Sequence, residues 1–285
     1  KMKLAKLTLL FLVAFSLSLL SAKGWEVDSD ILVNLTQGIY SDNWSGSEKS
    51  TVTWVAQSNT TAQKQMKEWL NYKNTLKLAF GQTHQEKGDI DGDGEVEWGS
   101  GQKSTDKIDF ESLFRFTLKS FVDPYMALRM ESQFVDESGA KKYYVNPMLF
   151  TESAGIMKSI INGDKTKLSL RLGAAIRENV DRKLDVTPVD GGAEAVAEFK
   201  KIFGDAAASY NSRLSVYQAI FNSKKDPNGY WKETDYRWEN MLSTKLFGLL
   251  SANLSFDIVY DRDKQVNNKV QWKEILGLGF SYSLF

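Results

Sequence analysis

Ser251-Ala-Asn-Leu-Ser-Phe-Asp-Ile-Val-Tyr260 is the stretch that decides the fold, because its side chains alternate in polarity along its whole length. Leu254, Phe256 and Ile258 fall on one parity, whereas Asn253, Ser255 and Asp257 fall on the other. Successive side chains of a strand point to opposite faces of its sheet, so this period of two predicts a strand with one apolar and one polar face.

The same alternation recurs along the rest of the chain. It is clear at 106–119, 126–134, 167–177 and 275–284, and weaker at 27–36, 51–62, 72–84, 147–159, 193–203, 207–222 and 233–247. With 251–260, these segments make twelve predicted strands. Segment 193–203 is also compatible with a short amphipathic helix, because its Ala, Glu and Lys residues favour helices, and a helix there would reduce the count to eleven.

The connections between the predicted strands alternate in length. Short ones carry turn residues at 122–124, 162–164, 203–205 and 247–249, and long polar ones occupy 37–50, 86–105, 135–146, 178–192, 223–232 and 261–270. Short periplasmic turns and long extracellular loops are typical of an all-β, antiparallel, up-and-down barrel that spans the bacterial outer membrane. An even number of strands places both chain ends on the periplasmic side.

A secreted, soluble β-sandwich is the alternative fold. Two features favour the barrel: charge, Gly and Ser recur on the polar faces, and aromatic residues lie near the ends of the apolar faces. Such aromatics would form girdles at the two lipid–water interfaces. They are Tyr125, Phe134, Tyr230, Trp231, Trp238, Tyr260 and Trp272.

The composition excludes several functional classes. The 285 residues include no cysteine, so there is no disulfide framework, thiolate metal site or cysteine nucleophile, and a single histidine, His84, rules out a histidine-rich metal site. The 36 basic and 36 acidic residues balance, which argues against a nucleic-acid partner.

A basic, then apolar, segment opens the sequence. Lys1, Lys3 and Lys6 precede the apolar run 7–20, and the small residues Ser21 and Ala22 follow it. This order is typical of a secretory signal peptide, and the run is shorter than the roughly 20 residues that a membrane-spanning helix needs. The sequence therefore predicts a cleaved signal at 1–22 and a mature, mildly acidic barrel at 23–285.

Several motifs along the mature chain resemble a family of porin-like outer-membrane β-barrel proteins of unknown function. They are Asn43-Trp44 with Gly46, Asn74-Thr75-Leu76 leading to Gly81, Ser132-Gln133-Phe134, Asn146-Pro147, Val259-Tyr260-Asp261-Arg262-Asp263 and Gly277-Leu278-Gly279-Phe280-Ser281-Tyr282. The sequence departs from the family pattern in having one Gly after Asn-Trp and a long acidic insert at 86–105. The resemblance implies a fold and a location in the outer membrane of a Gram-negative bacterium, and it implies no reaction.

The C-terminus resembles the signal that outer-membrane proteins present to the barrel-assembly machinery. An alternating strand ends in Phe285, and Tyr282 lies three residues before it, one residue away from the usual aromatic position. We therefore expect this machinery as a partner during biogenesis, together with outer-membrane lipid.

The long loop 86–105 contains half of a calcium-binding pattern. In Asp89-Ile-Asp91-Gly-Asp93-Gly-Glu95-Val-Glu97, carboxylates at positions 1, 3 and 5 precede a Gly at position 6, and Glu95 and Glu97 occupy positions 7 and 9. Position 12 is Ser100, so Asp106 or Asp109 would have to supply the last ligand. A solvated acidic loop is the alternative. Calcium is the one cofactor that the sequence suggests, and it is not required by the fold.

The charges on the polar parity are expected to line the barrel lumen, because a charged side chain facing lipid is costly near the membrane midplane. The predicted lumen-lining residues, with Lys273 beside them, are Glu111, Arg115, Lys119, Arg129, Glu131, Arg171, Arg177, Arg213, Arg237, Glu239 and Asp257. Two interpretations remain open: a solute pathway with a modest preference for anions, or an interior plugged by Arg–Glu pairs.

No catalytic constellation is found. His84 has Thr83 and Gln85 as sequence neighbours, and no serine-hydrolase motif surrounds it. The most favoured function is a passive channel for small solutes. The alternatives are a non-conducting structural or interaction barrel that acts through its extracellular loops and, more remotely, an outer-membrane lipid hydrolase.

Overall fold

A computed structural model describes residues 24–40, 49–91, 93, 95–223, 228–262 and 270–283, with the side chains of 281–283 excepted. Twelve long strands dominate it. They are β1 (Glu26–Gly38), β2 (Thr51–Lys67), β3 (Leu70–Gly88), β5 (Gln102–Phe116), β6 (Asp123–Ser132), β9 (Met148–Asn162), β10 (Thr166–Val180), β11 (Val189–Phe203), β12 (Ala208–Asn222), β13 (Asp235–Phe247), β14 (Leu250–Tyr260) and β15 (Gln271–Ser283).

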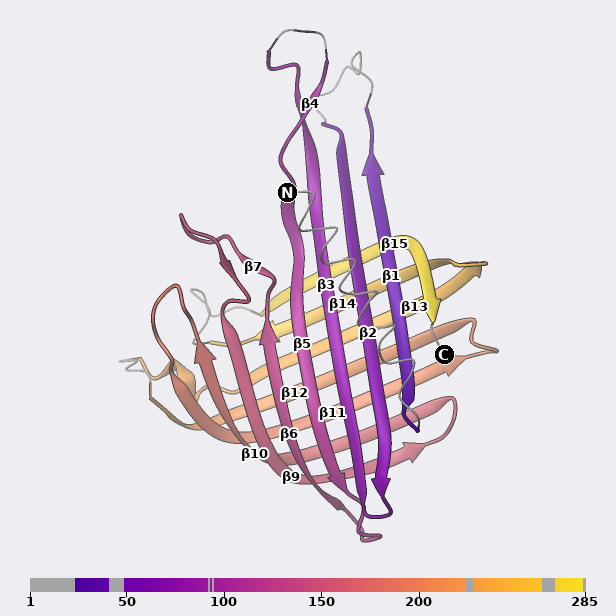
Figure 1. The fold of residues 1–285 in the computed structure, drawn as a ribbon, viewed down its shortest axis with the longest axis vertical. Coiled ribbons are helices and arrows are strands. Elements are labelled where there is room, and N and C mark those ends of the chain that lie inside the picture. Colours follow the sequence, from indigo (N-terminus) through magenta and orange to yellow (C-terminus); the bar gives the residue numbers. More distant parts are fainter. Residues whose placement is uncertain are drawn as a thin grey trace.

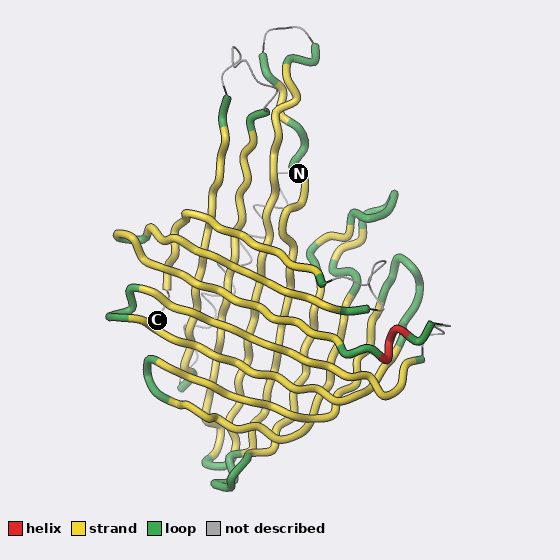
Figure 2. The backbone as a smooth tube through the Cα atoms, turned by 180° about the vertical axis from the view of Figure 1, so that it is seen from behind, coloured by secondary structure: helices red, strands yellow, loops and turns green. Residues whose placement is uncertain are grey.

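The twelve strands form a closed antiparallel barrel (Figures 1 and 2). Each long strand pairs with the next one along the chain, and β1 pairs with β15, where Val33 lies opposite Phe280. Closure leaves no long strand with an unpaired edge, which is the condition for a sheet to exist in lipid. The predicted all-β, up-and-down barrel is confirmed.

Short elements lie in the connections. They are the strands β4 (Glu97–Trp98), β7 (Val135–Asp136) and β8 (Tyr143–Tyr144) and the 3-10 turn η2 (Tyr230–Lys232). Among the residues that the structure describes, no helix is long and apolar enough to cross a membrane.

Segment 193–203 is a strand, within β11, and not a helix. It pairs with β12 along its whole length and with β10 as far as Lys201, with Ala197 opposite both Leu170 and Leu214. Pairing on both sides satisfies the backbone of a segment whose Ala and Glu residues favour helices, so tertiary context overrides local propensity. The count of long strands is therefore even.

The connections divide the barrel into two ends. Short turns at 68–69, 117–122, 163–165, 204–207 and 248–249 form the turn end. The strand ends that the longer connections join, such as Gly38 and Thr51, lie at the opposite end, which we call the loop end. At the loop end, β1, β2 and β3 rise well above the rim made by the later strands (Figure 1). β3 has 19 residues and β6 has 10, so this part of the sheet extends far beyond the length that crosses a bilayer.

The outer surface is apolar. On β10 the side chains of Leu170, Leu172 and Ile176 are exposed, whereas Arg171 and Ala175, on the other parity, are buried. A belt of this kind on a closed barrel is suited to contact with lipid. Other exposed members are Leu128, Ile156, Leu214, Leu242, Leu276, Leu278 and Phe280.

The predicted aromatic girdle needs one correction and one addition. Tyr125 does not lie in it, because its side chain is buried inside the barrel, where it packs against Leu113 and Met157. Trp238 and Trp272 are exposed on the outside. At the turn end, Trp69 stacks on Phe116, with ring centroids 6.2 Å apart. Phe121, Phe203 and Phe247 are exposed at the same end.

Two sequence predictions concern residues at the ends of the chain. The predicted signal peptide, 1–22, lies outside the described residues, as does Phe285. The backbone of Tyr282 belongs to β15 and lies opposite Ile31 of β1, so the last strand of the chain is the one that closes the barrel.

Candidate functional site

Charged side chains meet across the interior of the barrel. Lys107 on β5 forms an ion pair with Glu239 on β13, and these strands lie six apart in the ring of twelve. Because strands six apart are on opposite walls, the pair must cross the lumen. The charged side chains of the interior form two chains of contacts, described in turn below, and this pair belongs to the second.

The turn-side chain is centred on Glu111 of β5. Its Oε2 accepts hydrogen bonds from Arg171 Nη2 of β10 at 2.9 Å and from Arg213 Nη2 of β12 at 2.7 Å. Arg213 also pairs with Glu198 of β11, whose carboxylate lies 3.6 Å from Lys73 Nζ of β3. The chain therefore runs from β3 through the lumen to β11, β12 and β10, and back to β5.

The loop-side chain is centred on Glu239. Its carboxylate meets Lys107 and also Lys77 of β3, at 3.2 Å. Lys107 lies 3.5 Å from Asp109, which Arg129 of β6 binds with two hydrogen bonds of 2.8 and 2.9 Å. We call the two chains together the crossing network.

The loop-side chain ends at a second contact across the lumen. Arg129 lies 3.2 Å from Glu131, and Glu131 pairs with Arg237 of β13. β6 and β13 lie five apart in the ring, so this pair also spans the interior.

The crossing network is largely removed from water. Asp109, Glu111, Arg129, Arg171 and Arg213 each keep less than a tenth of their surface exposed. Buried charges are tolerated when they are paired and hydrogen-bonded, and Glu111 and Asp109 each accept at least two hydrogen bonds. Seven cations face five carboxylates in this network, which leaves an excess of positive charge.

Ten of the eleven predicted lumen residues fall into three groups. Seven belong to the crossing network: Glu111, Arg129, Glu131, Arg171, Arg213, Arg237 and Glu239. Arg115 binds Asp123 near the turn end, and Arg177 binds Asp190 and Asp235 near the loop end. Asp257 lies opposite Lys273 on the adjacent strand.

The prediction that Lys119 lines the lumen is wrong. β5 ends at Phe116, and Lys119 lies in the following turn with a positive φ of 57° and an exposed side chain. The prediction continued the alternation of β5 to Lys119, three residues beyond the end of the strand at Phe116. The backbone has already turned there, so the alternation no longer applies.

Several members of the crossing network were not identified from the sequence. Lys73 and Lys77 lie on a weakly alternating strand, Glu198 on the segment of ambiguous helix or strand character, and Lys107 near a predicted strand end. Lys107 shares the parity of Asp109 and Glu111, and this signal could have identified it.

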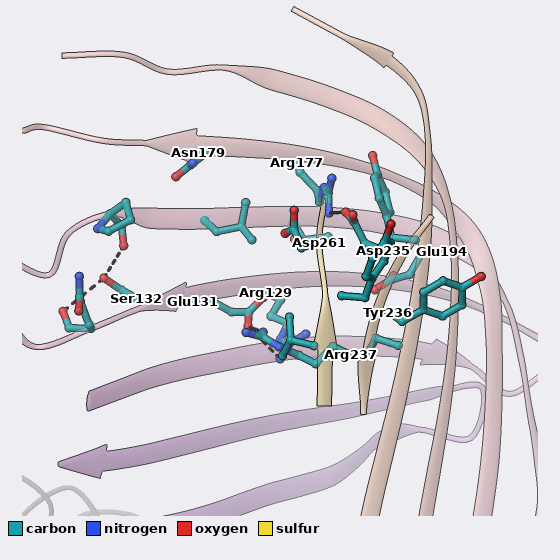
Figure 3. Close-up of a pocket in the computed structure, with 18 residues that line it drawn as sticks. Arg129, Glu131, Ser132, Arg177, Asn179, Glu194, Asp235, Tyr236, Arg237 and Asp261 are labelled. Atoms are coloured by element: carbon teal, nitrogen blue, oxygen red, sulfur yellow. Dashed lines mark hydrogen bonds and ion pairs between the residues drawn. The ribbon is translucent and has the colours of Figure 1, made fainter. Parts of the chain in front are cut away.

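A cup of about 400 Å³ opens at the loop end, above the loop-side chain (Figure 3). Arg129, Glu131 and Arg237 of the crossing network contribute to its lining, and Arg177 and Asp235 meet on another part of the wall. The guanidinium of Arg177 lies 3.6 Å from the ring centroid of Tyr217, whose hydroxyl donates a 2.6 Å hydrogen bond to Asp190. These contacts hold the wall in place.

One side of the cup is bounded by connection 133–147, which Asn146 fastens to connection 181–188. Asn146 is fully buried, and its side-chain amide donates to Asp181 Oδ1 at 3.2 Å and lies 3.4 Å from Asp136 Oδ2. Its Oδ1 accepts from the Arg182 backbone N–H at 2.8 Å. We call Asn146, Asp136 and Asp181 the loop clasp.

The pKa values of both carboxyls in the loop clasp are lowered. Hydrogen bonds from the Ser138 hydroxyl and backbone N–H lower the pKa of Asp136. For Asp181, partial burial acts to raise the pKa, but hydrogen bonds from Asn146 and from the backbone N–H groups of Lys183 and Leu184 outweigh it. Both clasp carboxyls are therefore held in the ionised form.

The predicted calcium loop is only partly assembled. The carboxylates of Asp89, Asp91 and Glu97 offer oxygens that all lie within 4.8 Å of one another, and these side chains are exposed or half-buried. Asp93 and Glu95 are not in this group. Asp93 Oδ1 accepts a 2.8 Å hydrogen bond from the Glu95 backbone N–H. Gly92 and Gly94 lie outside the described residues.

Neither substitute for the twelfth calcium ligand is free to serve. Asp106 accepts hydrogen bonds from the backbone N–H groups of Phe134 and Val135, and Asp109 is bound to Arg129 inside the barrel. The expectation that one of them completes the loop is therefore wrong, because both carboxylates are already engaged with other strands and loops.

His84 lies near the loop end of β3, where its Nδ1 is 3.3 Å from the carbonyl oxygen of Gly99. No serine of the described residues forms a hydrogen bond with its ring. The structure therefore assembles no Ser–His pair around this histidine among those residues.

A closed antiparallel barrel with an apolar outer belt and a charged interior defines the class: a porin-like β-barrel of the outer-membrane type. The model of a protein family of unknown function, DUF3078, matches residues 35–137. This match confirms the resemblance to a barrel family of unknown function. Its matched region includes the Asn74-Thr75-Leu76 and Ser132-Gln133-Phe134 motifs and ends before Asn146.

Three solved structures are similar to the chain at low sequence identity. The translocator domain of the autotransporter NalP from Neisseria meningitidis has 9% identity and a TM-score of 0.35, with 97% of this chain and 95% of that chain covered. The COG4313 outer membrane channel from Pseudomonas putida F1 has 12% identity and a TM-score of 0.42, with coverage of 92% and 96%. OprB from Pseudomonas putida has 10% identity and a TM-score of 0.25, with coverage of 91% and 93%. No curated protein matches the sequence.

Proposed function

We propose that the protein is a barrel of the Gram-negative outer membrane that is closed to solutes in its resting state and acts from its loop end. The observation that carries this proposal is the crossing network. Ion pairs between opposite walls occupy the lumen where a passive channel would need an open path. Of the two interpretations of the interior, a solute pathway or a plug of Arg–Glu pairs, these contacts favour the plug.

The physical cost of opening such a lumen supports a stable closed state. A solute on its way through would have to separate pairs such as Arg213–Glu111, whose members are almost completely buried. Leaving a buried charge without its partner costs several kcal/mol, on the order of 3–5. Thermal fluctuations alone would therefore open the path rarely.

A solute channel gated by the crossing network is the second candidate. The cup leads from the loop end directly onto Arg129, Glu131 and Arg237, so a solute entering there would meet charged side chains and not an apolar plug. The excess of cations in the network would favour anions once the path is open. In this case the protein would still be a channel for small solutes, as the sequence predicts, but opening of the crossing network would control the passage.

Conductance in planar lipid bilayers tests the proposal. The wild-type barrel should show no steady unit conductance, whereas Glu239→Ala should conduct, because it removes the carboxylate that holds Lys77 and Lys107 against the opposite wall. Glu178→Ala, which truncates an exposed glutamate of β10, is the control and should stay silent.

Two results would contradict the closed-barrel proposal. A steady conductance of the wild-type protein would restore the passive channel. Silence of Glu239→Ala, with folding established by circular dichroism and by the heat-dependent mobility of the barrel on gels, would contradict the role given to Glu239 as part of the barrier. Reversal potentials in a salt gradient would then report the sign of any ion that passes.

We further propose that the protein reaches the membrane through the barrel-assembly machinery. The support is that β15, which carries Tyr282, is the strand that closes the ring against β1. Outer-membrane lipid is the proposed partner of the apolar belt.

No catalytic activity is part of the proposal, and phospholipid turnover that depends on His84 would contradict it.

A further inference from the structure

The cup at the loop end contains one carboxylate without a partner. Glu194 on β11 is half-buried and lines the cup, and it forms no ion pair or hydrogen bond with any residue that the structure describes. The other ionised groups of the wall are paired: Arg177 binds both Asp190 and Asp235. A half-buried carboxylate with no partner is suited to receive a cationic group from outside.

The cup also presents a guanidinium with free donors. Arg237 bonds Glu131 through Nη1, its only hydrogen bond with a described residue, and its side chain is 40% exposed. Nε and Nη2 therefore remain for an anion. A guanidinium binds a carboxylate well because its N–H groups form a planar fork.

The register of the strands sets the spacing of these two groups. Glu194 lies opposite Tyr217, and Tyr217 lies opposite Asp235, so Glu194 and Arg237 are two strands and two residues apart. With strands about 4.8 Å apart and about 3.4 Å per residue, their Cα atoms are separated by roughly 12 Å. Both side chains reach into the cup, so their charged ends can contact opposite ends of one small molecule (Figure 3).

We infer that the cup is a binding site for a small zwitterion of the amino-acid or dipeptide class. The ligand's ammonium group would contact Glu194, and its carboxylate would contact Arg237. Ser215 lies on β12 between these two strands, directly opposite Arg237, and offers a hydroxyl to the middle of the ligand. Tyr236 and Val259 supply the less polar part of the wall.

The inference does not depend on whether the barrel conducts. Binding at the cup requires only that Glu194 and Arg237 keep their places, and a closed lumen beneath would make the cup a receptor site, whereas a gated lumen would make it the entrance. Calorimetric binding and bilayer conductance therefore fail or succeed independently of each other.

The test is isothermal titration of the folded barrel in detergent with L-alanyl-L-alanine as the probe. Two analogues each lack one charge: N-acetyl-L-alanyl-L-alanine has no ammonium group, and L-alanyl-L-alanine amide has no carboxylate. Wild type should bind the zwitterion at least tenfold more tightly than either analogue, since a charge-assisted hydrogen bond contributes about 1.5–3 kcal/mol.

Two variants assign the contacts. Glu194→Gln should bind the zwitterion and the acetylated analogue with equal, weakened affinity, because the ammonium contact is lost. Arg237→Gln should likewise stop distinguishing the zwitterion from the amide. Glu152→Gln, on an exposed glutamate of β9, is the matched control and should leave the wild-type ranking unchanged.

Circular dichroism and heat-dependent gel mobility first establish that each variant is folded, and the binding results then decide the question. Absence of heat with the zwitterion overturns the inference. So does binding in which both analogues match the zwitterion, or preferential binding of an uncharged sugar such as maltose. Equal losses for both analogues in both variants would indicate a general disturbance of the cup and would also overturn the assigned contacts.

Discussion

Lys107 and Glu239 form an ion pair across the full width of the barrel, from strands that lie on opposite sides of the ring. The same carboxylate meets Lys77 at 3.2 Å, so a single side chain of β13 holds two lysines of the opposite wall. The crossing network thus acts as a set of struts as well as a plug, and its removal should change both stability and permeability.

Glu111→Ala should destabilise the barrel strongly. This substitution leaves the guanidinium groups of Arg171 and Arg213 buried without their shared carboxylate. We expect a loss of about 3–5 kcal/mol in the free energy of unfolding, measured by urea titration of the protein in lipid vesicles. Glu178→Ala, on the exposed surface, should lie within about 0.5 kcal/mol of wild type. A Glu111→Ala variant as stable as this control would show that the turn-side chain contributes little.

Gly173→Ala should interfere with barrel formation. A Cβ at this position would lie 2.4 Å from the Ala154 carbonyl oxygen and 2.6 Å from the Tyr125 hydroxyl. Because the first of these atoms belongs to the backbone of the neighbouring strand, the strands would have to move apart. We expect a loss of at least about 1–3 kcal/mol, the usual cost of overpacking, and slower folding into vesicles.

Gly139→Ala serves as the control for this substitution. A Cβ at Gly139 would meet its nearest atom at 3.5 Å, an ordinary van der Waals distance. If both alanine variants fold at the wild-type rate and with wild-type stability, the close approach of β9 and β10 at Gly173 is not a constraint on the fold.

The loop clasp should open in acid. The folded-state pKa values of Asp136 and Asp181 are depressed, so their contribution is fully present above the ordinary Asp pKa of about 3.9 and is lost as the pH falls through the lower, folded-state values. The protection of 133–147 and 181–188 against hydrogen exchange, relative to the intrinsic exchange rate at each pH, should therefore be high at neutral pH and fall below about pH 4.

Asn146→Ala should give the open state of the clasp at neutral pH. It removes a fully buried amide that joins the two connections through both its N–H and its oxygen. We expect exchange in these two connections to be faster by about tenfold, the equivalent of one lost hydrogen bond. Unchanged exchange in Asn146→Ala would mean that other contacts hold the connections together.

Calcium binding at the loop above β3 remains a prediction, and the structure changes which variants test it. Titration calorimetry with calcium should detect a weak site that Asp91→Asn and Glu97→Gln each abolish, because their carboxylates converge with that of Asp89. Asp93→Asn should retain the site, because Asp93 is not part of that cluster. If the wild-type protein gives no heat with calcium, the alternative interpretation, a solvated acidic loop without a bound ion, is the correct one.

The sequence by itself determined the strands, their faces and the closed barrel. Side chains alternate with a period of two in β10 and β14 as in most other strands, and this pattern depends only on local backbone geometry and on the polarity of each residue. The pattern gave a wrong prediction at Lys119, where the backbone has left the strand. It also did so at Tyr125, because a tyrosine side chain can face either lipid or the barrel interior.

Only the tertiary structure decided which charges meet. Lys107 and Glu239 are 132 positions apart, and Arg213 and Glu111 are 102 apart, so no spacing in the sequence connects them. Their contact depends on ring closure and on the register of every intervening pair of strands. The polar parity could therefore place these side chains inside the barrel, but whether the interior was an open path or a set of crossing ion pairs required the closed ring itself.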